Sequence, residues 1–483
     1  MAAPSFDLPR AAAPSSLRPR RWQQQLIQLL RRRLLTTAER EQDVLVFAGP
    51  GAGKTLGALL AFRTFQQDRQ LERCLVFCHR TSILHQWLSA GERLGLNLQE
   101  WPWPADGEGP DGKPPDGLVL TYQGARRQLG HLSETLEPWM GTSCLAVADE
   151  AHHLGVDPDE PDGLAWGQTF LDLTGRSRLR LGLTGTPFRA DNLAFCAARR
   201  VRSVQGGMPV ELISPDLCVE PRELIAAGDV RPLEFHFQDG WVEHGREGVP
   251  DRDVSPLSGE RRESWRARNL RRAIRLADSS CIGQQVLLRA QRKLEQIRRC
   301  HPQAAGLVIA RDIAHAEAIT QILEDDGNRV DLVHSQEREA SDRLRLFQTG
   351  QADWLVSIDM CAEGFDAPRL RVVAYLTTVV TRSRFVQGIT RAVRMTADLA
   401  AAEPIPRHPS YVYAPADPLL MGYARTWSVA EPYVLRHPAE EGDAADPSTA
   451  SGATLQLPLE AVEDGAGEVI RLKTPQLPTF LQR

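Results

Sequence analysis

The sequence lacks a long hydrophobic run and has no strong excess of charge of one sign. No apolar stretch approaches the roughly 20 residues that a membrane-spanning helix needs. The formal net charge is only −5, so any surface that binds nucleic acid must be local. Hydrophobic residues make up 42% of the 483 residues and charged residues 25%, which is typical of a globular chain with two or three domains.

The sequence also lacks a spaced set of cysteines that would predict a disulfide framework or a zinc module. Its eight cysteines are scattered, and only Cys74 and Cys78 lie close together. On a strand this spacing puts both thiols on one face and could bind a metal, but no second Cys or His pair follows at a zinc-like distance. Buried thiols in a reducing compartment, such as the cytoplasm, are the simpler interpretation.

The two ends of the chain differ in composition from its middle. The first 20 residues are rich in Ala, Pro, Ser and Arg and have no apolar signal core, so we expect a disordered N-terminal tail over residues 1–17. Residues 426–483 form a second tail that we expect to be acidic and largely disordered. Within it, residues 438–470 carry acidic side chains and no Lys or Arg, so this stretch could shield a basic groove.

A glycine-rich segment is the first motif that carries chemistry. Residues 44–47 predict a strand, residues 48–55 are Ala-Gly-Pro-Gly-Ala-Gly-Lys-Thr, and residues 56–62 predict a helix. This order is the one required by a phosphate-binding loop, although Ala48 stands where the strict pattern has Gly. The backbone N–H groups of such a loop form an anion cradle that a Cβ atom would obstruct. The residues expected to bind the nucleotide here are Gly49, Pro50, Gly51, Ala52, Gly53, Lys54 and Thr55.

Two adjacent carboxylates follow an apolar strand predicted at 144–148. Hydrolysis of a nucleotide needs a carboxylate for Mg²⁺ at the end of a neighbouring strand and a group that orients water. We expect Asp149 and the Thr55 hydroxyl to hold Mg²⁺, and Glu150 to polarise the attacking water. Such a pair is common by itself, but together with the phosphate-binding loop it predicts a nucleotide-hydrolysing enzyme.

Strands and helices alternate along two parts of the chain, with polar motifs after the strands. This pattern is typical of an α/β fold with doubly wound parallel sheets. A second α/β unit begins at residue 306 and has no glycine-rich loop of its own. The further strands expected are 74–78, 118–123 and 179–183 in the first unit and 306–310, 330–333, 354–358 and 372–376 in the second.

Several motifs occur in a fixed order over about residues 18–395. Residues 149–152 are Asp-Glu-Ala-His, and residues 184–189 are Thr-Gly-Thr-Pro-Phe-Arg. Residues 360–368 include Glu-Gly-Phe-Asp-Ala-Pro, and residues 387–394 match Gln-x-x-x-Arg-x-x-Arg. The ordered set resembles that of superfamily 2 helicase-type ATPases of the DEAD/DEAH kind, nearest to type III restriction subunits and repair-type helicases.

The resemblance implies two tandem RecA-like domains with an ATP cleft between them. The first domain would span residues 18–205 and the second residues 301–425. Residues 206–300 would be a linker or insert of helical and loop segments. Its arginine-rich stretch, residues 261–275, would be a basic helix that is either a solvated face or a contact to a nucleic-acid backbone.

The resemblance also implies roles around the nucleotide. Gln23 would read the adenine edge, and Gly364 and Asp366 would sense the nucleotide from the second domain. Arg391 and Arg394 lie three residues apart, so on a helix they would share one face. Arg394 is the first choice for the arginine that stabilises charge at the γ-phosphate, with Arg391 beside it. The alternative for both arginines is a solvated helix surface.

Coupling between the domains would involve His152, Thr184 and Thr186. His152 could bond to Gln387, which belongs to the catalytic set with the two arginines, or it could be a satisfied structural histidine. ATP and Mg²⁺ would draw the domains together, because the arginine gains a partner only when the γ-phosphate is present.

Two short segments resemble the family's nucleic-acid contacts. Residues 78–87 correspond to its first such motif, although the family usually has Pro where His79 or its neighbour stands. The residues implied to contact nucleic acid are His79, Arg80, Thr121, Tyr122 and Gln123.

We therefore expect an ATP-dependent DNA helicase or translocase that uses Mg²⁺. One alternative is an RNA helicase of the same superfamily, and another is an ATP-switched DNA-binding clamp or remodelling subunit without strand separation. The intact Lys54 and Glu150 disfavour an inactive clamp. The tail shows no nuclease pattern, so a protein partner could supply a nuclease or loading function, and no membrane is expected as a partner.

Overall fold

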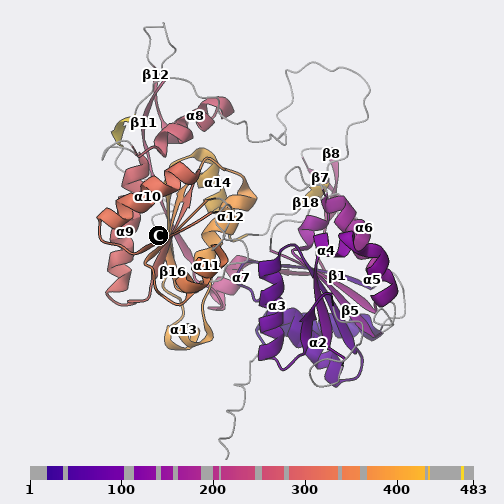
Figure 1. The fold of residues 1–483 in the computed structure, drawn as a ribbon. Helices are drawn as coiled ribbons and strands as arrows, with labels where there is room; N and C mark the ends of the chain where they lie inside the picture. Colours follow the sequence, from indigo (N-terminus) through magenta and orange to yellow (C-terminus); the bar gives the residue numbers. More distant parts are fainter. Residues whose placement is uncertain are drawn as a thin grey trace, which may run out of the picture.

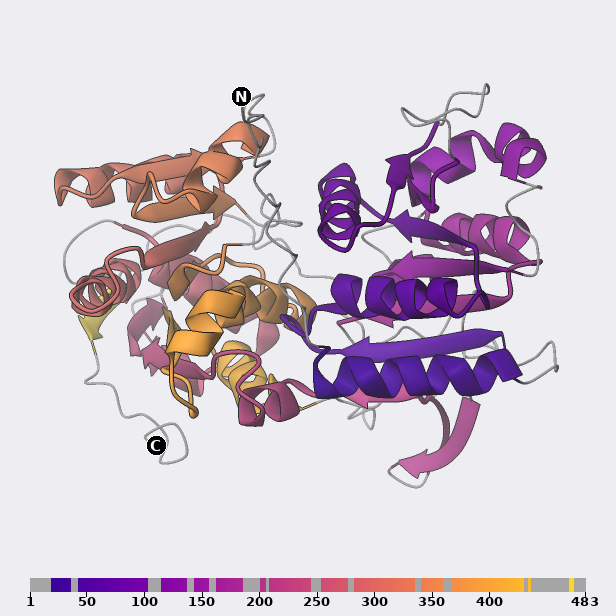
Figure 2. The same ribbon diagram turned by 90° about the horizontal axis from the view of Figure 1, so that it is seen from below.

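Two α/β units lie side by side in the computed structural model of this chain (Figures 1 and 2). Each is built on a parallel sheet. Among the residues that the structure describes, no helix combines the length and apolar character needed to cross a membrane. The described residues are 19–35, 42–102, 114–136, 143–155, 162–185, 200–205, 208–244, 253–276, 282–334, 340–358, 367–429, 433–435 and 469–472.

The first unit has a seven-stranded sheet in the order β3-β4-β2-β5-β6-β1-β9. Its strands are β1 (Asp43–Ala48), β2 (Arg73–Cys78), β3 (Leu98–Glu100), β4 (Gly117–Thr121), β5 (Cys144–Asp149), β6 (Leu179–Thr184) and β9 (Leu217–Val219). Helices α1 (Arg21–Leu35), α2 (Lys54–Gln67) and α3 (Thr81–Arg93) cover one face, and α4 (Tyr122–Arg127), α5 (Leu129–Leu136) and α6 (Gly163–Thr174) cover the other. The central strands are mostly apolar because both faces of the sheet are buried.

The second unit has a six-stranded parallel sheet in the order β10-β17-β16-β13-β15-β14. Its strands are β10 (Leu233–Gln238), β13 (Ala305–Ala310), β14 (Val330–Val333), β15 (Trp354–Ile358), β16 (Leu370–Leu376) and β17 (Ser410–Pro415). Helices α9 (Ile282–Arg298) and α10 (Ile313–Asp325) pack on one face, and α11 (Ala340–Gln348), α12 (Arg382–Ile389) and α14 (Pro418–Thr426) pack on the other. A short helix, α13 (Ala397–Ala402), follows the 3-10 turn η4 (Thr390–Val393). The expectation of two doubly wound parallel sheets is confirmed.

Part of the segment 206–300 belongs to the two sheets. Strand β9 pairs with β1 at the edge of the first sheet, and β10 pairs with β17 at the edge of the second. Helix α9 packs against β16 and β17. Helix α7 (Pro221–Ala226) lies between β9 and β10. The connection between the units is therefore shorter than the linker or insert expected from the sequence.

Two small antiparallel sheets complete the fold. One is formed by β7 (Arg200–Gln205), β8 (Met208–Ile213) and β18 (Tyr433–Leu435). The other is formed by β11 (Gly240–His244), β12 (Asp253–Pro256) and β19 (Val469–Leu472), and it is followed by the 3-10 turn η3 (Leu257–Gly259) and helix α8 (Glu263–Ala273). The expected C-terminal tail thus contributes β18 and β19, and most of its other residues lie outside the described part of the chain.

The arginine-rich stretch 261–275 contains helix α8, and some of its arginines are buried. Arg266 is 5% exposed, and its Nη1 atom lies 2.8 Å from Oδ2 of Asp417, which is completely buried. Asp417 also accepts hydrogen bonds from the backbone at the start of α14. This part of the stretch therefore fastens α8 to the second unit. The exposed arginines of the stretch are Arg261, Arg262 and Arg275.

We predict that Arg266→Ala strongly destabilises the second unit. The substitution leaves the Asp417 carboxylate buried without its cation, which typically costs about 3–5 kcal/mol. Arg261→Ala, at an exposed position before the same helix, should change the free energy of unfolding by no more than about 0.5 kcal/mol. Urea unfolding of both variants measures the difference, and equal stabilities would contradict the anchoring role of Arg266.

Candidate nucleotide-hydrolysis site

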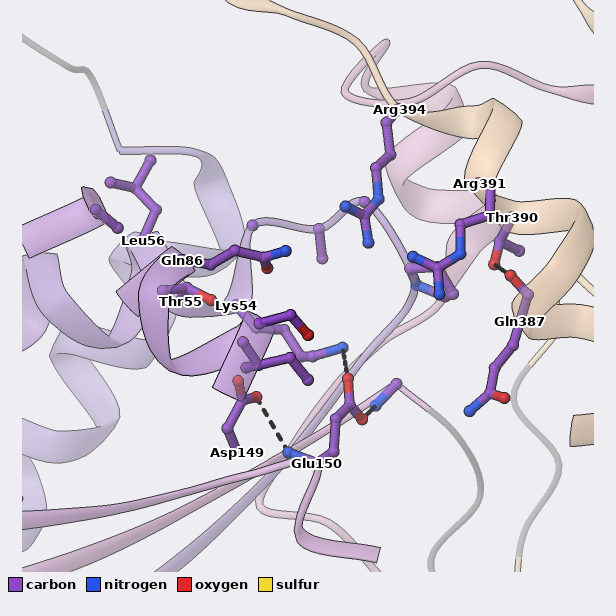
Figure 3. Close-up of a pocket in the computed structure, with 18 of the residues that line it drawn as sticks. Lys54, Thr55, Leu56, Gln86, Asp149, Glu150, Gln387, Thr390, Arg391 and Arg394 are labelled. Atoms are coloured by element: carbon purple, nitrogen blue, oxygen red, sulfur yellow. Dashed lines mark hydrogen bonds and ion pairs between the residues drawn. The ribbon is translucent and has the colours of Figure 1, made fainter. Parts of the chain in front are cut away.

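A cleft of about 830 Å³ is lined by residues of both units (Figure 3). The first unit contributes the glycine-rich loop, residues along α3, and the ends of β5 and β6. The second unit contributes α11, α12 and η4. The two halves of the chain therefore build one site together.

The glycine-rich loop leads from β1 directly into α2. Gly51 and Gly53 have φ angles of 77° and 78°, a left-handed conformation that glycine adopts without steric cost. Helix α2 begins at Lys54, so the free N–H groups of its first turn lie beside this loop. The loop is therefore suited to hold an anion at a helix N-terminus.

Lys54 and the two carboxylates converge at the ends of neighbouring strands. Lys54 Nζ lies 3.0 Å from Oε1 of Glu150, and the Gly185 amide donates to Oε2 of Glu150 at 3.2 Å. Trp87, in α3, donates its indole N–H to Oδ2 of Asp149 at 2.7 Å. Figure 3 shows Asp149 and Glu150 beneath the Lys54 side chain. Glu150 has a φ of 47°, an uncommon conformation for a residue with a side chain, and such strain is found mostly at functional sites.

The two carboxylates differ in their electrostatics. Burial raises the pKa of Asp149, and the neighbouring Glu150 charge raises it further. Burial also acts to raise the pKa of Glu150, but Lys54, with help from His152, outweighs it and holds that pKa below its ordinary value. Glu150 is therefore ionised near neutral pH.

The residues present fit a nucleotide with Mg²⁺. The positive φ angles of the loop leave space for close approach of phosphate to backbone, and Lys54 supplies a cation beside it. Asp149 and Thr55 both line the cleft, and carboxylate and hydroxyl oxygens are ligands that Mg²⁺ prefers. The loop residues 49–55 all line the cleft.

Arg391, Arg394 and Gln387 approach the cleft from the second unit. Helix α12 ends at Ile389, a 3-10 turn spans Thr390–Val393, and Arg394 has extended backbone angles, so the two arginines do not share an α-helical face. The expectation of one helix is wrong because the helix tightens into this turn, where Thr390 Oγ1 donates to the Val386 carbonyl. Figure 3 nevertheless shows both guanidinium groups directed into the cleft opposite Lys54.

The predicted adenine reader, Gln23, lies behind the glycine-rich loop. It is 1% exposed, its Nε2 donates to the Gly53 carbonyl at 3.1 Å, and its Oε1 accepts from the Arg20 amide at 2.9 Å. The neighbouring Arg20 lines the cleft, and its Nη1 donates to the Gly51 carbonyl at 2.7 Å. In this structure Gln23 supports the loop, and its contact with adenine stays a prediction.

Of the three residues predicted to couple the domains, His152 and Thr184 are in contact. His152 Nδ1 lies 3.1 Å from Thr184 Oγ1 and 3.5 Å from Oε2 of Glu150, so the end of β6 is linked to the catalytic carboxylate. The ring of His153 lies between those of His152 and His79, with centroid distances of 4.1 Å and 4.3 Å. Thr186, Gly364 and Asp366 lie outside the described residues.

Of the five residues predicted to contact nucleic acid, four are exposed or partly exposed and one is buried. Arg80 and Gln123 are exposed, His79 lines the cleft, and Thr121 caps α4 by accepting a hydrogen bond from Gly124. Tyr122 is 1% exposed, and its hydroxyl donates to the Asp149 carbonyl at 2.9 Å. Its side chain therefore supports the end of β5, so a direct contact between this ring and nucleic acid does not fit the structure.

Two residues of the site were not predicted from the sequence. Trp87, which is 62 positions from Asp149 in the sequence, donates a hydrogen bond to the Asp149 carboxylate. Arg20 donates a hydrogen bond to the glycine-rich loop. The pair Arg20-Arg21 before Trp22-Gln23 is a sequence signal for Arg20. No pattern in the sequence identifies Trp87, which looks like any other core aromatic residue.

Comparison with known proteins agrees with this architecture. The family description "Type III restriction enzyme, res subunit" matches residues 16–189, and "Helicase conserved C-terminal domain" matches residues 290–396. The chain is 30% identical over 419 residues to the uncharacterised protein Rv2917 of Mycobacterium tuberculosis, a match that covers 86% of this chain and 64% of that protein. The chain thus spans less than two thirds of the length of that relative.

Two solved structures share the fold. A Vibrio vulnificus fragment assigned to the HsdR subunit of a type I restriction enzyme has a TM-score of 0.54 at 16% identity, covering 86% of this chain and 67% of its own. The restriction-modification enzyme LlaBIII, bound to DNA, has a TM-score of 0.51 at 16% identity, covering 84% of this chain and 28% of its own. These structures show the shared fold, and the two family matches support a superfamily 2 helicase of the type III restriction-like branch.

Proposed function

We propose that this protein is an ATP-dependent DNA helicase or translocase that hydrolyses Mg²⁺-ATP in the cleft between its two units. The observation that carries the proposal is the division of charge across that cleft. Lys54, Asp149 and Glu150 lie on one wall, and Arg391 and Arg394 lie on the other. An arrangement in which both walls must meet the same substrate supports a motor, because turnover then changes how the units contact each other.

Each charged group has a separate task in the proposed reaction. The glycine-rich loop and Lys54 bind the phosphates, and Asp149 with Thr55 holds Mg²⁺, which supplies charge stabilisation when bound. Glu150 polarises the attacking water, since its carboxylate is ionised and its orientation is set by the Gly185 amide. Arg394, with Arg391 and Gln387 beside it, stabilises the charge that develops on the transferred phosphoryl group.

The coupling residues offer a route between hydrolysis and nucleic acid. His152 contacts both Glu150 and Thr184, and the stacked ring of His153 joins it to His79 at the end of β2. Arg80, next in the chain, is exposed and suited to a phosphate of a bound strand. We favour DNA as that strand because the Thr-Gly-Thr-Pro-Phe-Arg motif resembles the restriction and repair branch.

We predict that Lys54→Ala and Glu150→Gln both abolish ATP turnover, but only the first weakens ATP binding. Glu150→Gln removes the base, which typically contributes a factor of about 10² or more, while the phosphate-binding loop stays intact. Steady-state turnover and ATP titration of the two variants separate the effects. Loss of ATP binding by Glu150→Gln would count against Glu150 as the base.

For Arg394→Ala we expect kcat to fall by about 10³-fold with little change in KM. An arginine that acts on transition-state charge contributes on this scale, and it contributes less to ground-state binding. Arg299→Ala, which removes an exposed arginine at the end of α9, is the control and should turn over ATP normally. A rise in KM without a fall in kcat would assign Arg394 to substrate binding instead.

Nucleic acid should stimulate the ATPase, and single-stranded or junction DNA should do so most. Turnover is measured across a panel of single-stranded DNA, duplex, fork and RNA at fixed salt, because phosphate contacts depend strongly on ionic strength. Stimulation by RNA alone would replace DNA with RNA as the substrate. ATP turnover that is unchanged by every nucleic acid in the panel would contradict the helicase or translocase proposal.

A further inference from the structure

The connection between the two units, residues 228–231, is buried and bonded on both sides. It runs from the end of α7 to the start of β10. Val230 and Arg231 are each only 1% exposed. Connections between domains are usually exposed and make few contacts, so this degree of burial calls for a physical reason.

On the first unit, the connection is tied to the glycine-rich loop through Arg20. The Arg20 Nε atom lies 3.4 Å from Oδ1 of Asp229, and its Nη1 atom donates to the Gly51 carbonyl at 2.7 Å. Val230 contacts the same part of the loop. A Cβ atom placed on Gly51 would lie 2.8 Å from Cγ1 of Val230.

On the second unit, the connection is tied to the turn that carries the arginines. The Arg231 amide donates to the carbonyl of Val393 at 2.8 Å, and Val393 directly precedes Arg394. The Arg231 side chain lies 2.6 Å from Oε1 of Glu403 and donates to the His408 carbonyl at 3.1 Å. Removal of either partner would leave a buried charge, so this attachment is costly to break.

The two attachments meet at Gly51. The same added Cβ atom would lie 3.4 Å from Cγ2 of Val393 and 3.8 Å from Cγ of Arg394. Val230 therefore packs at the point where the phosphate-binding loop and the arginine-bearing turn come together.

We propose that residues 229–231 are a spacer that sets the distance between the phosphate-binding loop and Arg394, with Val230 as a positioning residue for hydrolysis. The inference rests on the proposed nucleotide site. Val230 is not among the residues that line the cleft, so it would act through its packing against Gly51 and the turn at Val393. Because a misplacement of about 1 Å can cost about 10²-fold in rate, a loosened spacer should lower kcat more than it changes ATP binding.

The test compares Val230→Ala with Leu224→Ala. Leu224 lies in α7, is 2% exposed, and serves as a control for the loss of buried aliphatic volume outside the spacer. For Val230→Ala we expect kcat per folded molecule to fall at least tenfold with KM unchanged, whereas Leu224→Ala should keep the wild-type kcat. Equal kcat values for the two variants would overturn the proposal.

Hydrogen exchange supplies a readout that does not depend on turnover. Addition of the non-hydrolysable analogue AMP-PNP with Mg²⁺ should increase the protection of residues 389–396 in the wild type and in Leu224→Ala. In Val230→Ala the analogue should still bind by titration, but this gain in protection should be lost. If the analogue increases the protection of residues 389–396 in Val230→Ala as much as in the wild type, the proposal would also be overturned.

Asp229 allows a second test with a milder change, because its side chain is 25% exposed. Asp229→Asn removes the charge that faces Arg20, and we expect kcat to fall several-fold, with recovery in Asp229→Glu. Equal kcat values for Asp229→Asn and the wild type would remove Asp229 from the spacer.

A wild-type protein that neither binds nor hydrolyses ATP would overturn the proposed function and this inference together. An active wild type whose kcat is matched by Val230→Ala would overturn the inference alone.

Discussion

The ion pair between Lys54 and Glu150 is the interaction on which the candidate site depends. It joins the first residue of α2 to the end of β5, two elements brought together because β1, β6 and β5 are neighbours in one parallel sheet. The carboxyl ends of parallel strands lie at one edge, where ligands of α/β proteins bind. The pair keeps the half-buried Glu150 carboxylate ionised, and it holds the Lys54 ammonium beside the glycine-rich loop before any phosphate is present.

A second constraint is that the site is divided between two units. Arg391 and Arg394 enter the cleft from the turn after α12, so the complete set of charges exists only while the units remain packed. One hydrophobic cluster extends through both units. Residues 229–231 are linked to the glycine-rich loop through Arg20 on one side and bond directly to the turn at Val393 on the other. In a helicase-type protein this division supports a coupling of ATP hydrolysis to relative movement of the units.

The fold and the motif residues were largely predictable from the sequence, because they depend on local patterns. Apolar runs such as residues 144–148 identify strands, and glycines before Lys54 identify the loop. The roles of Gln23 and Tyr122 were not predictable, because burial and side-chain direction arise from tertiary packing. Strand β9 has only three residues and carries no periodic signal. The hydrogen bond between Trp87 and Asp149 joins distant positions that no local pattern relates.

The central claim is that one nucleotide is held by both units at once. The most direct measurement is an experimental structure of the chain with Mg²⁺ and a non-hydrolysable ATP analogue. We expect Lys54 and Arg394 both to contact the γ-phosphate group of the analogue, with Asp149 on the Mg²⁺ side. An analogue bound to the glycine-rich loop while Arg394 stays out of contact, with the cleft fully closed, would contradict it.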